Sequence, residues 1–215
     1  MARLLPLFPL QLVVFPGSAT PLHIFEDRYK EMVGEAEAAG TEFGIVLAKD
    51  GGIMNAGCTV LVESVLKRYP DGRFDVLTRG QRRFMIQSLN QDKEYLRGEV
   101  EYYSDEDTGS APAELRRQAV LALQRMQLAL SQGEALSSVE TEPAPDADHP
   151  FLSFQLAEAV DHLDFRNTLQ RTRSETERLR VFADFTEEYV ERKRYAARMK
   201  RATPQNGFGH KPAIQ

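Results

Sequence analysis

Several features are scarce or absent in this chain of 215 residues, and each absence narrows the possibilities. The chain has one cysteine, Cys58, so no disulfide bond can form within it, and nothing in the composition calls for an oxidising compartment. No apolar run approaches the roughly 20 residues that span a bilayer. We therefore expect a cytoplasmic protein that has no membrane partner.

The N-terminal segment MARLLPLFPLQLVVFPG is apolar enough to suggest a signal peptide. However, Pro6, Pro9 and Pro16 interrupt it, and no A-x-A-like cleavage site follows. We therefore expect buried N-terminal strands in this segment.

The composition is that of an ordinary globular protein, with 42% hydrophobic and 27% charged residues. The net charge of −5 argues against nucleic acid as the main partner. The charge is unevenly distributed, because from Arg192 to the end the chain has seven Lys or Arg residues and no Asp or Glu.

The first half of the sequence predicts short strands. Alternation of apolar and polar residues after the turn signal Pro70-Asp71-Gly72 is typical of strands with one buried face. The predicted strands are Ala2–Phe8, Leu12–Phe15, Glu42–Ala48, Cys58–Tyr69, Arg73–Thr78, Arg82–Leu89 and Tyr95–Tyr103. One helix is expected among them, with Asp27 as its N-cap and Gly40 as its stop.

The second half changes to helical periodicity. Apolar residues recur every three or four positions from Ala113 to Ser131 and again from Phe151 to Leu163. Ser174 and Glu177 fit a capping box that opens a last long helix. Residues 131–150 between the helices are polar and acidic and predict a mobile loop.

These patterns predict an α+β protein with two parts. A β-rich lobe occupies residues 1–107 and a helical subdomain occupies residues 108–203, with the acidic stretch Ser104–Gly109 as the hinge. Residues 204–215 are expected to form a disordered tail. Many short strands separated by turns favour a closed or half-closed barrel in the first lobe.

Three segments resemble a known family. The string from Leu5 to Val33 is similar to the opening of the substrate-binding domain of Lon proteases. The stretch Phe43–Leu47, together with the run DGRFDVLTRGQRRF from Asp71 to Phe84, is similar to the middle strands of that domain. Ser174–Arg180 (SETERLR) resembles the start of the last long helix of that domain. The resemblance implies a PUA-like β pseudo-barrel followed by a small helical bundle.

The resemblance also implies recognition without catalysis. In full Lon proteins this unit precedes an ATPase module and a peptidase module, and this sequence contains no G-x-x-x-x-G-K-[ST] phosphate loop. We therefore expect a peptide-recognition module that is not an enzyme, needs no cofactor or metal, and binds unfolded or partly folded polypeptide. An adaptor role beside a protease or chaperone follows from the same resemblance.

The residues themselves offer few catalytic or metal-binding candidates. Cys58 begins an apolar strand, where a buried and inert thiol is the usual outcome, although a nucleophile is the alternative. Asp161, His162 and Asp164 are the nearest approach to a metal-ligand set. Neighbouring positions on a helix point in different directions, so a solvated helix end is the favoured interpretation.

The candidate peptide-binding residues are His23, Glu26, Asp27, Arg28 and Tyr29. The imidazole of His23 lies either at the entrance of a binding groove or in a turn that it holds through a backbone hydrogen bond. The charged residues open the first helix, and exposed side chains beside an apolar groove suit peptide capture. A cleft between the two lobes is the expected place for such a groove.

The basic end of the chain supports an alternative function. Glu191–Arg201 (ERKRYAARMKR) interleaves cations with Tyr195, a composition that suits contact with RNA phosphates. The simpler explanation is a helix C-terminus, where positively charged side chains interact favourably with the negative end of the helix dipole. RNA binding is therefore the second hypothesis, behind polypeptide recognition.

Overall fold

The computed structural model describes residues 4–107, 110–131 and 145–202, with side chains up to residue 199. Of the expected mobile loop only residues 131 and 145–150 are described, and the expected tail lies outside the described residues. The strands are β1 (Leu5–Leu10), β2 (Ala19–Ile24), β3 (Phe43–Lys49), β4 (Gly52–Arg68), β5 (Phe74–Asn90) and β6 (Arg97–Tyr103). The helices are α1 (Asp27–Ala39), α2 (Ala113–Ser131), α3 (Leu152–Glu158), α4 (Leu163–Arg171) and α5 (Glu175–Ala202).

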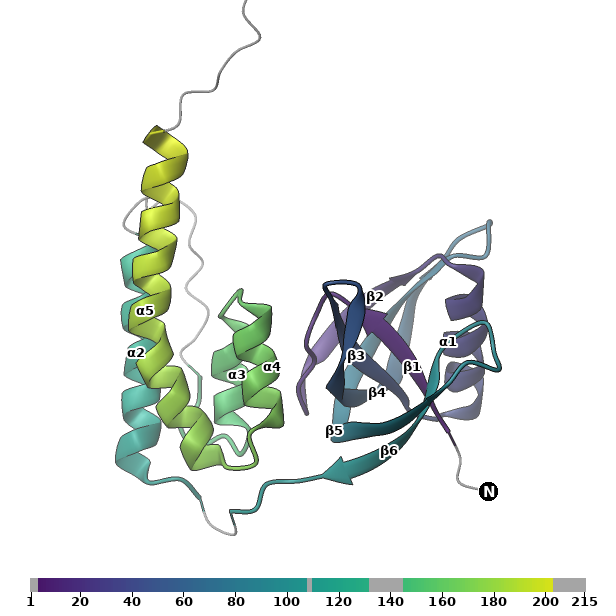
Figure 1. Cartoon of the computed structure of the whole chain (residues 1–215), viewed down its shortest axis with the longest axis horizontal. Helices are drawn as coiled ribbons and strands as arrows, with labels where there is room; N and C mark the ends of the chain where they lie inside the picture. Colours follow the sequence, from purple (N-terminus) through teal and green to yellow (C-terminus); the bar gives the residue numbers. More distant parts are fainter. Residues whose placement is uncertain (1–3, 108–109, 132–144, 203–215) are drawn as a thin grey trace, which may run out of the picture.

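The strands and α1 form one lobe, here called the β lobe, and α2 to α5 form a second, the helical lobe (Figure 1). This is the predicted α+β fold, a pseudo-barrel followed by a helical bundle. The last strand ends at Tyr103 and the next helix begins at Ala113.

Five strands of the β lobe close into a ring. β1 pairs with β3, β3 with β4, β4 with β5, β5 with β6, and β6 returns to β1. β2 lies outside the ring and, among the described residues, pairs only with the first half of β5. Closure removes the edges of the ring strands, so β2 is left with one unpaired edge.

β5 is a single long strand where the alternation pattern predicts two, Arg73–Thr78 and Arg82–Leu89. Its first half pairs with β2 and its second half with β6. The break in the pattern falls at Gly80, where a Cβ atom would lie only 2.0 Å from the carbonyl oxygen of Phe15. The glycine at this position admits a close backbone approach within a continuous strand.

The segment Leu12–Phe15 is not a strand, contrary to the prediction. Val13, Val14 and Phe15 are buried, but they lie in the connection between β1 and β2. Their carbonyls bond to the helical lobe, since Arg166 donates to Val13 O at 2.9 Å and Gln170 donates to Val14 O at 2.8 Å. The apolar run Leu12–Phe15 is therefore explained by burial at the junction between the lobes, and not by a strand.

The helices follow their apolar stripes with two corrections. Glu26 is the N-cap of α1 and Asp27 is its first helical residue, while Gly40 ends the helix with a positive φ of 60° as predicted. The helix expected from Phe151 to Leu163 is shorter than predicted, since α3 ends at Glu158. Leu163 instead begins α4, which His162 caps by accepting from the Phe165 amide at 3.2 Å. Ser174 accepts from the Glu177 amide at 3.0 Å, as the capping box predicts.

One apolar cluster joins the two lobes. It unites Val13, Phe15 and Leu47 of the β lobe with buried residues of all four helices of the helical lobe. Phe15 stacks on Phe154 of α3 with their ring centroids 4.9 Å apart. The lobes therefore share a core, and surfaces at their junction have defined positions.

Candidate functional site

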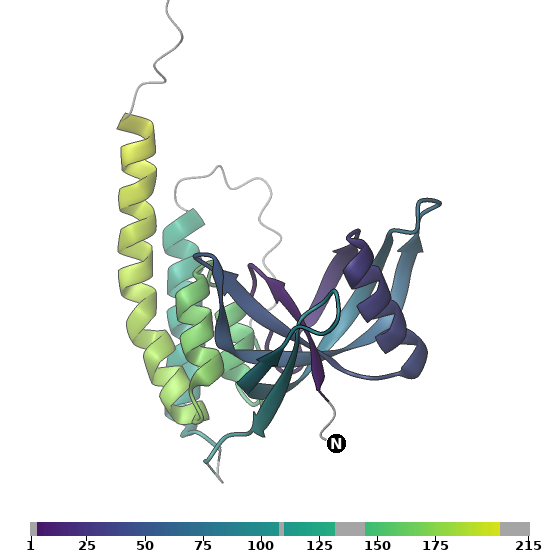
Figure 2. The same ribbon diagram turned by 45° about the vertical axis from the view of Figure 1, so that its right-hand side comes forward.

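The predicted peptide-binding residues lie at one end of the β lobe. His23 is on β2, and Glu26 to Tyr29 open α1, on the side of the β lobe away from α3 and α4 (Figures 1 and 2). The structure brings His23 close to Phe25, with their ring centroids 5.9 Å apart, but it does not place this group at the junction.

The side chains of this group differ in exposure. The exposed fraction of the side chain is 97% for Asp27, 47% for Arg28 and 40% for Glu26, and Arg28 bonds to Glu26 at 2.7 Å. Tyr29 is buried and stacks on Phe8, with their ring centroids 4.0 Å apart. Tyr29 therefore anchors α1 to the core beneath the exposed residues.

His23 does not hold a turn through the backbone. Its Nδ1 lies 2.5 Å from Oδ1 of Asp75 on the neighbouring strand β5, and Tyr69 donates to Oδ2 of the same carboxylate at 2.8 Å. These hydrogen bonds hold the pKa of Asp75 below its ordinary value. Phe25 next to them is 58% exposed, so an aromatic and polar surface lies beside β2.

Cys58 is in the middle of β4 and fully buried. Burial raises the pKa of its thiol to about 12, so the reactive thiolate is scarce at neutral pH. The expected inert thiol fits this environment.

The three residues considered as metal ligands have other partners. Asp164 pairs with Lys49 at 2.5 Å, Asp161 pairs with Lys193 at 3.5 Å, and His162 caps α4. Within the part of the chain that the structure describes, no group of three or more His, Cys, Asp or Glu residues could hold a metal ion.

Two adjoining cavities lie at the junction of the lobes, and we call them together the seam groove. The first, of about 510 Å³, is lined by Pro16, Gln81, Arg82, Arg83, Tyr102, Tyr103, Ser104, Asp105, Phe151 and Phe154. The second, of about 410 Å³, is lined by Pro16, Gly17, Ser18, Ala19, Arg79, His149, Phe151, Phe154, Gln155 and Glu158. Both lobes contribute to each cavity, so the groove exists only in the folded chain.

The walls of the seam groove are rich in aromatic rings. Tyr102 is 42% exposed and Phe151 is 41% exposed, and the Arg82 guanidinium lies 4.0 Å from the centroid of the Tyr102 ring. Exposed rings at a concave junction offer apolar contact area that loses little conformational entropy on binding. The second cavity includes Ala19, the first residue of β2, so the groove adjoins the strand with the unpaired edge.

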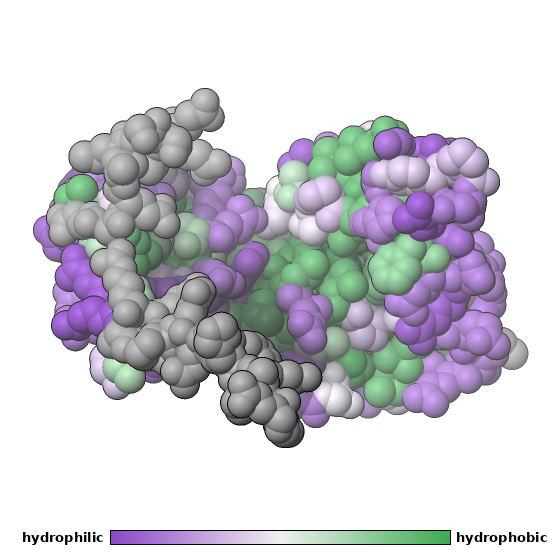
Figure 3. Space-filling model, turned by 90° about the horizontal axis from the view of Figure 1, so that it is seen from above, coloured by the Kyte–Doolittle hydropathy of each residue, from purple (hydrophilic) through white to green (hydrophobic). Residues whose placement is uncertain are grey.

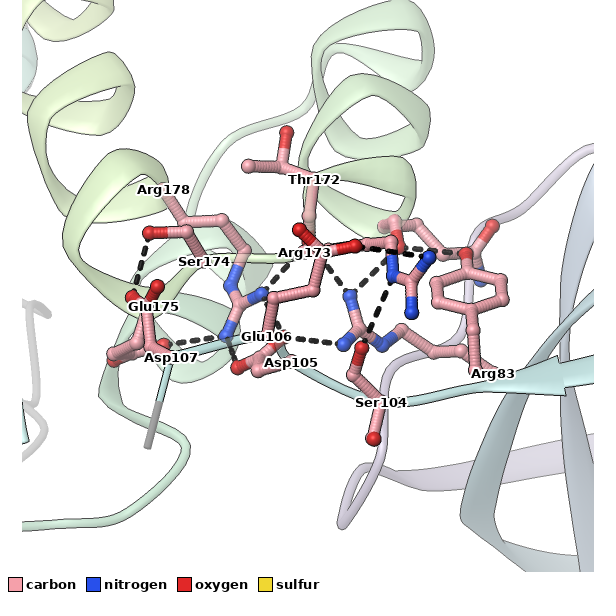
Figure 4. A network of polar contacts seen from close by, with 12 residues as sticks. Arg83, Ser104, Asp105, Glu106, Asp107, Thr172, Arg173, Ser174, Glu175 and Arg178 are labelled. Carbon is pink, nitrogen blue, oxygen red and sulfur yellow. Dashed lines mark hydrogen bonds and ion pairs between the residues drawn. The ribbon is translucent and has the colours of Figure 1, made fainter. Parts of the chain in front are cut away.

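A buried cluster of charged residues fixes the first cavity (Figure 4). The arginine cluster consists of Arg83 from β5, Asp105 from the β6–α2 connection, and Glu175 and Arg178 from α5. Asp105 bonds to both guanidinium groups, at 2.5 Å to Nη2 of Arg178. Arg178 also bonds to Glu175 at 2.7 Å.

The guanidinium groups of this cluster also bind backbone carbonyls. Nη1 of Arg83 donates to the carbonyls of Gln170 at 3.1 Å and Thr172 at 2.7 Å, and Nη1 of Arg178 donates to the Thr172 carbonyl at 2.8 Å. Since these carbonyls end α4, the cluster locks the helical lobe to β5.

Charge in this cluster is balanced. Burial alone raises the pKa of Asp105, but the hydrogen bonds and charges of Arg178 and Arg83 outweigh it and hold the pKa below its ordinary value. Two buried guanidinium groups therefore face the carboxyl groups of Asp105 and Glu175, which satisfies the requirement that buried charges be paired.

Sequence reasoning expected a cleft between the lobes, but it did not identify the residues that line the seam groove. Its residues come from four separate stretches of the chain, and only the aromatic pair Tyr102-Tyr103 and the apolar start at Phe151 gave a signal. The sequence analysis assigned the tyrosine pair to a strand and Phe151 to a helix. It did not connect them, because residues far apart in sequence meet only in the tertiary structure.

The chain is thus an α+β domain in which a β pseudo-barrel is joined to a helical bundle, with a groove between them. A family model described as the ATP-dependent protease La (LON) substrate-binding domain matches residues 4–193. The chain therefore belongs to the Lon substrate-binding domain family, which confirms the resemblance found in its sequence.

Individual relatives agree with this assignment. The Lon protease of Flavobacterium johnsoniae is 30% identical over 112 residues, which are 47% of this chain and 14% of that protein. The Lon protease of Roseiflexus castenholzii is 29% identical over 133 residues, 58% of this chain and 16% of that protein. The matched part is thus about one seventh of the length of these curated relatives.

Solved structures show the same fold. The Lon N-terminal domain protein from Xanthomonas campestris superposes with a TM-score of 0.65 at 28% identity, covering 83% of this chain and 95% of that one. The N-terminal domain of the Mycobacterium avium complex Lon protease has a TM-score of 0.57 at 18% identity, covering 86% of this chain and 98% of that one, and it supports the fold alone. In the described part of the chain, no helix is long and apolar enough to cross a membrane.

Proposed function

We propose that this chain is a non-catalytic module that recognises unfolded or partly folded polypeptides, as an adaptor in protein quality control or proteolysis. The observation that carries the proposal is the seam groove, where exposed aromatic rings line cavities between two lobes. Unfolded chains present apolar side chains that such a surface can cover. The name of the family, a substrate-binding domain, supports the same function.

Hydrophobic surface is also visible in the hollow between the lobes when the molecule is seen from above (Figure 3). An apolar hollow flanked by polar surface is typical of a binding site. The hydrophilic surround would limit association of the free protein through this surface, and the apolar interior would supply the affinity.

The unpaired edge of β2 would supply backbone hydrogen bonds. An extended polypeptide can add a strand to such an edge, and it then gains affinity that does not depend on its sequence. Pro21 in the middle of β2 interrupts the row of amide donors, so pairing would be short. A short pairing suits transient capture.

The predicted residues His23, Glu26, Asp27, Arg28 and Tyr29 belong to the proposal as a second contact surface. His23 and Phe25 flank the far end of β2, opposite the end where Ala19 meets the seam groove. A polypeptide that follows β2 would reach both surfaces, with Tyr29 acting from the core beneath them.

Fluorescence anisotropy with a labelled, permanently unfolded polypeptide tests the proposal. We expect saturable binding that persists at moderate salt. Phe151→Ala should weaken it about tenfold, because the loss of a buried ring in a binding site costs more than 1 kcal/mol. Phe25→Ala measures the contribution of the second contact surface to the affinity for the polypeptide. Leu89→Ala is the control, since Leu89 is 49% exposed and lines neither surface.

Two results would contradict the proposal. One is an absence of saturable polypeptide binding by the wild-type protein. The other is binding that Phe151→Ala and Phe25→Ala leave as unchanged as Leu89→Ala does. Cleavage of the polypeptide by the pure protein would contradict the non-catalytic part alone.

RNA binding is the second candidate function, and the exposed basic end of α5 favours it. Three of its cations already have partners, since Arg192 pairs with Glu188, Lys193 pairs with Asp161 at 3.5 Å, and Arg194 donates to the Ala129 carbonyl. RNA would have to replace these contacts. Binding of a labelled single-stranded RNA that falls steeply with salt and is lost on deletion of residues 192–215 would establish this function.

A further inference from the structure

A third concave surface lies on the helical lobe, apart from the seam groove. α2 and α5 run side by side (Figure 2), and a groove of about 1090 Å³ lies between them. Small and apolar residues, Ala122, Met126, Ala129, Ala183 and Val190, are among those that line it. A groove with such a lining is the shape into which a third helix packs.

Apolar residues stand exposed along this groove. Leu121, which lines it, is 47% exposed, and Leu128, two helical turns further along α2 on the same face, is 63% exposed. Exposed leucines in line along a groove indicate a surface that is covered by a partner.

One face of α5 changes its sign of charge along the helix. Asp184, Glu187, Glu191, Arg194 and Arg198 follow one another at spacings of three and four, so they share a face. The three acidic residues line the groove, and none of them forms an ion pair with another described side chain. The two arginines are exposed and follow the acidic residues along α5, and Arg194 donates to the Ala129 carbonyl of α2, a contact that a partner carboxylate would join or replace.

This charge pattern is complementary to itself in an antiparallel arrangement. If two α5 helices cross between residues 192 and 193, Glu191 of each lies opposite Arg194 of the other, and Glu187 lies opposite Arg198. The α5 wall of the groove, residues 183–191, and the helix end, residues 194–202, have the same length of roughly 13 Å. The end of one helix therefore fits the groove of a second copy in both length and charge.

We infer that the α2–α5 groove is a self-association surface, which the basic end of α5 from a second copy of this chain occupies in a two-fold symmetric dimer. In such an interface each copy gives the same surface, so the acid–base pairs are made twice. The leucines of α2 and Tyr195 of α5, which is 61% exposed, supply the apolar contact. The inference does not rest on polypeptide binding, because the seam groove has no residue in common with this surface.

Sedimentation equilibrium of the full chain, purified free of nucleic acid, measures the association. We expect a monomer–dimer equilibrium that weakens as salt rises. The double variant Glu187→Arg/Glu191→Arg and the double variant Arg194→Glu/Arg198→Glu should each associate at least about tenfold more weakly, because four attractive pairs become repulsive. An equimolar mixture of the two variants should recover association, since each then meets the opposite charge.

Circular dichroism verifies that the variants are folded, and Glu99→Arg/Glu101→Arg on the exposed face of β6 is the control for a change in net charge. A wild-type protein that stays monomeric at all concentrations overturns the inference, whatever else covers the groove. It is also overturned if the two variants associate as the control does, or if their mixture associates no better than each alone. Phe151→Ala should leave self-association unchanged, so failure here and failure of the proposed function are distinguishable.

Discussion

The interior of the β lobe and the junction between the lobes are both buried, but they are stabilised in different ways. Inside the ring of strands, the fully buried ring of Phe84 lies over Gly44 and Gly57, where a Cβ atom would come within 2.6 and 2.5 Å of it. At the junction, Arg83 and Arg178 are 4% and 1% exposed and bind carboxylates and carbonyls. The interior depends on shape and the junction depends on paired charge.

This difference has a consequence for function. An apolar interior tolerates changes that conserve volume, whereas a buried charge cluster does not tolerate the loss of one partner. The seam groove lies against the charge cluster, so its geometry depends on a few hydrogen-bonded groups. Substitutions there should therefore alter binding and stability together.

The largest effect is expected from Arg178→Ala. Its removal leaves Asp105 and Glu175 without their shared cation, and loss of one member of a buried charged pair costs about 3–5 kcal/mol of the free energy of unfolding. Urea unfolding measures the difference. Lys49→Ala removes a second ion pair across the junction, with Asp164, that is exposed and should have a far smaller effect. Equal losses in both variants would show that burial of the cluster is unimportant.

An intermediate effect is expected where the junction meets the sheet. Gly80→Ala places a Cβ atom against the Phe15 carbonyl, and the backbone must shift, at a cost of about 1–3 kcal/mol. Gly34→Ala in α1 is the matched control, because nothing lies within 4 Å of its added Cβ. That change should raise the free energy of unfolding by about 0.5–1 kcal/mol, since alanine favours a helix over glycine. Thermal unfolding should show opposite shifts in the two variants, and shifts of the same sign would contradict the close approach of Gly80 to Phe15 as the cause.

The smallest effect is expected in the pH dependence of stability. The pKa of Asp105 is lowered in the folded state, so its ionised form contributes stability that is present above the ordinary pKa of about 3.8 and is lost as the pH falls through the folded-state pKa. Asp105→Asn removes this titration. Urea unfolding from pH 6 down to pH 3 should therefore show a shallower loss of stability in the variant than in the wild type. Parallel curves would mean that Asp105 does not carry this part of the acid sensitivity.

Much of the fold could be predicted from local patterns. The stripe of buried residues in α2 and the glycine that ends α1 are set by contacts within three or four residues, so periodicity and conformational preference identify them. β2 was missed because Pro21 and His23 break the apolar run, although its pairing with β5 is complete over six residues. The boundary between α3 and α4 was missed because both helices bury apolar residues in the same cluster.

The candidate site was less predictable than the fold. His23 and Arg28 could be proposed because they stand in a string that resembles the family, and the structure places His23 on β2 and Arg28 in the first turn of α1. Phe151 and Tyr102 could not be proposed as partners, since 49 positions separate them along the chain and no local pattern links them.

The sequence by itself determined the class of the fold, the membership of the Lon substrate-binding domain family and the burial of Cys58. These properties follow from residue order and local periodicity, which a single chain displays directly. Only the tertiary structure decided that Leu12–Phe15 joins the lobes, that Asp105 links two buried arginines, and that aromatic rings from both lobes form one groove. These features depend on which residues, distant in sequence, are buried against one another. That burial arises only when the chain folds.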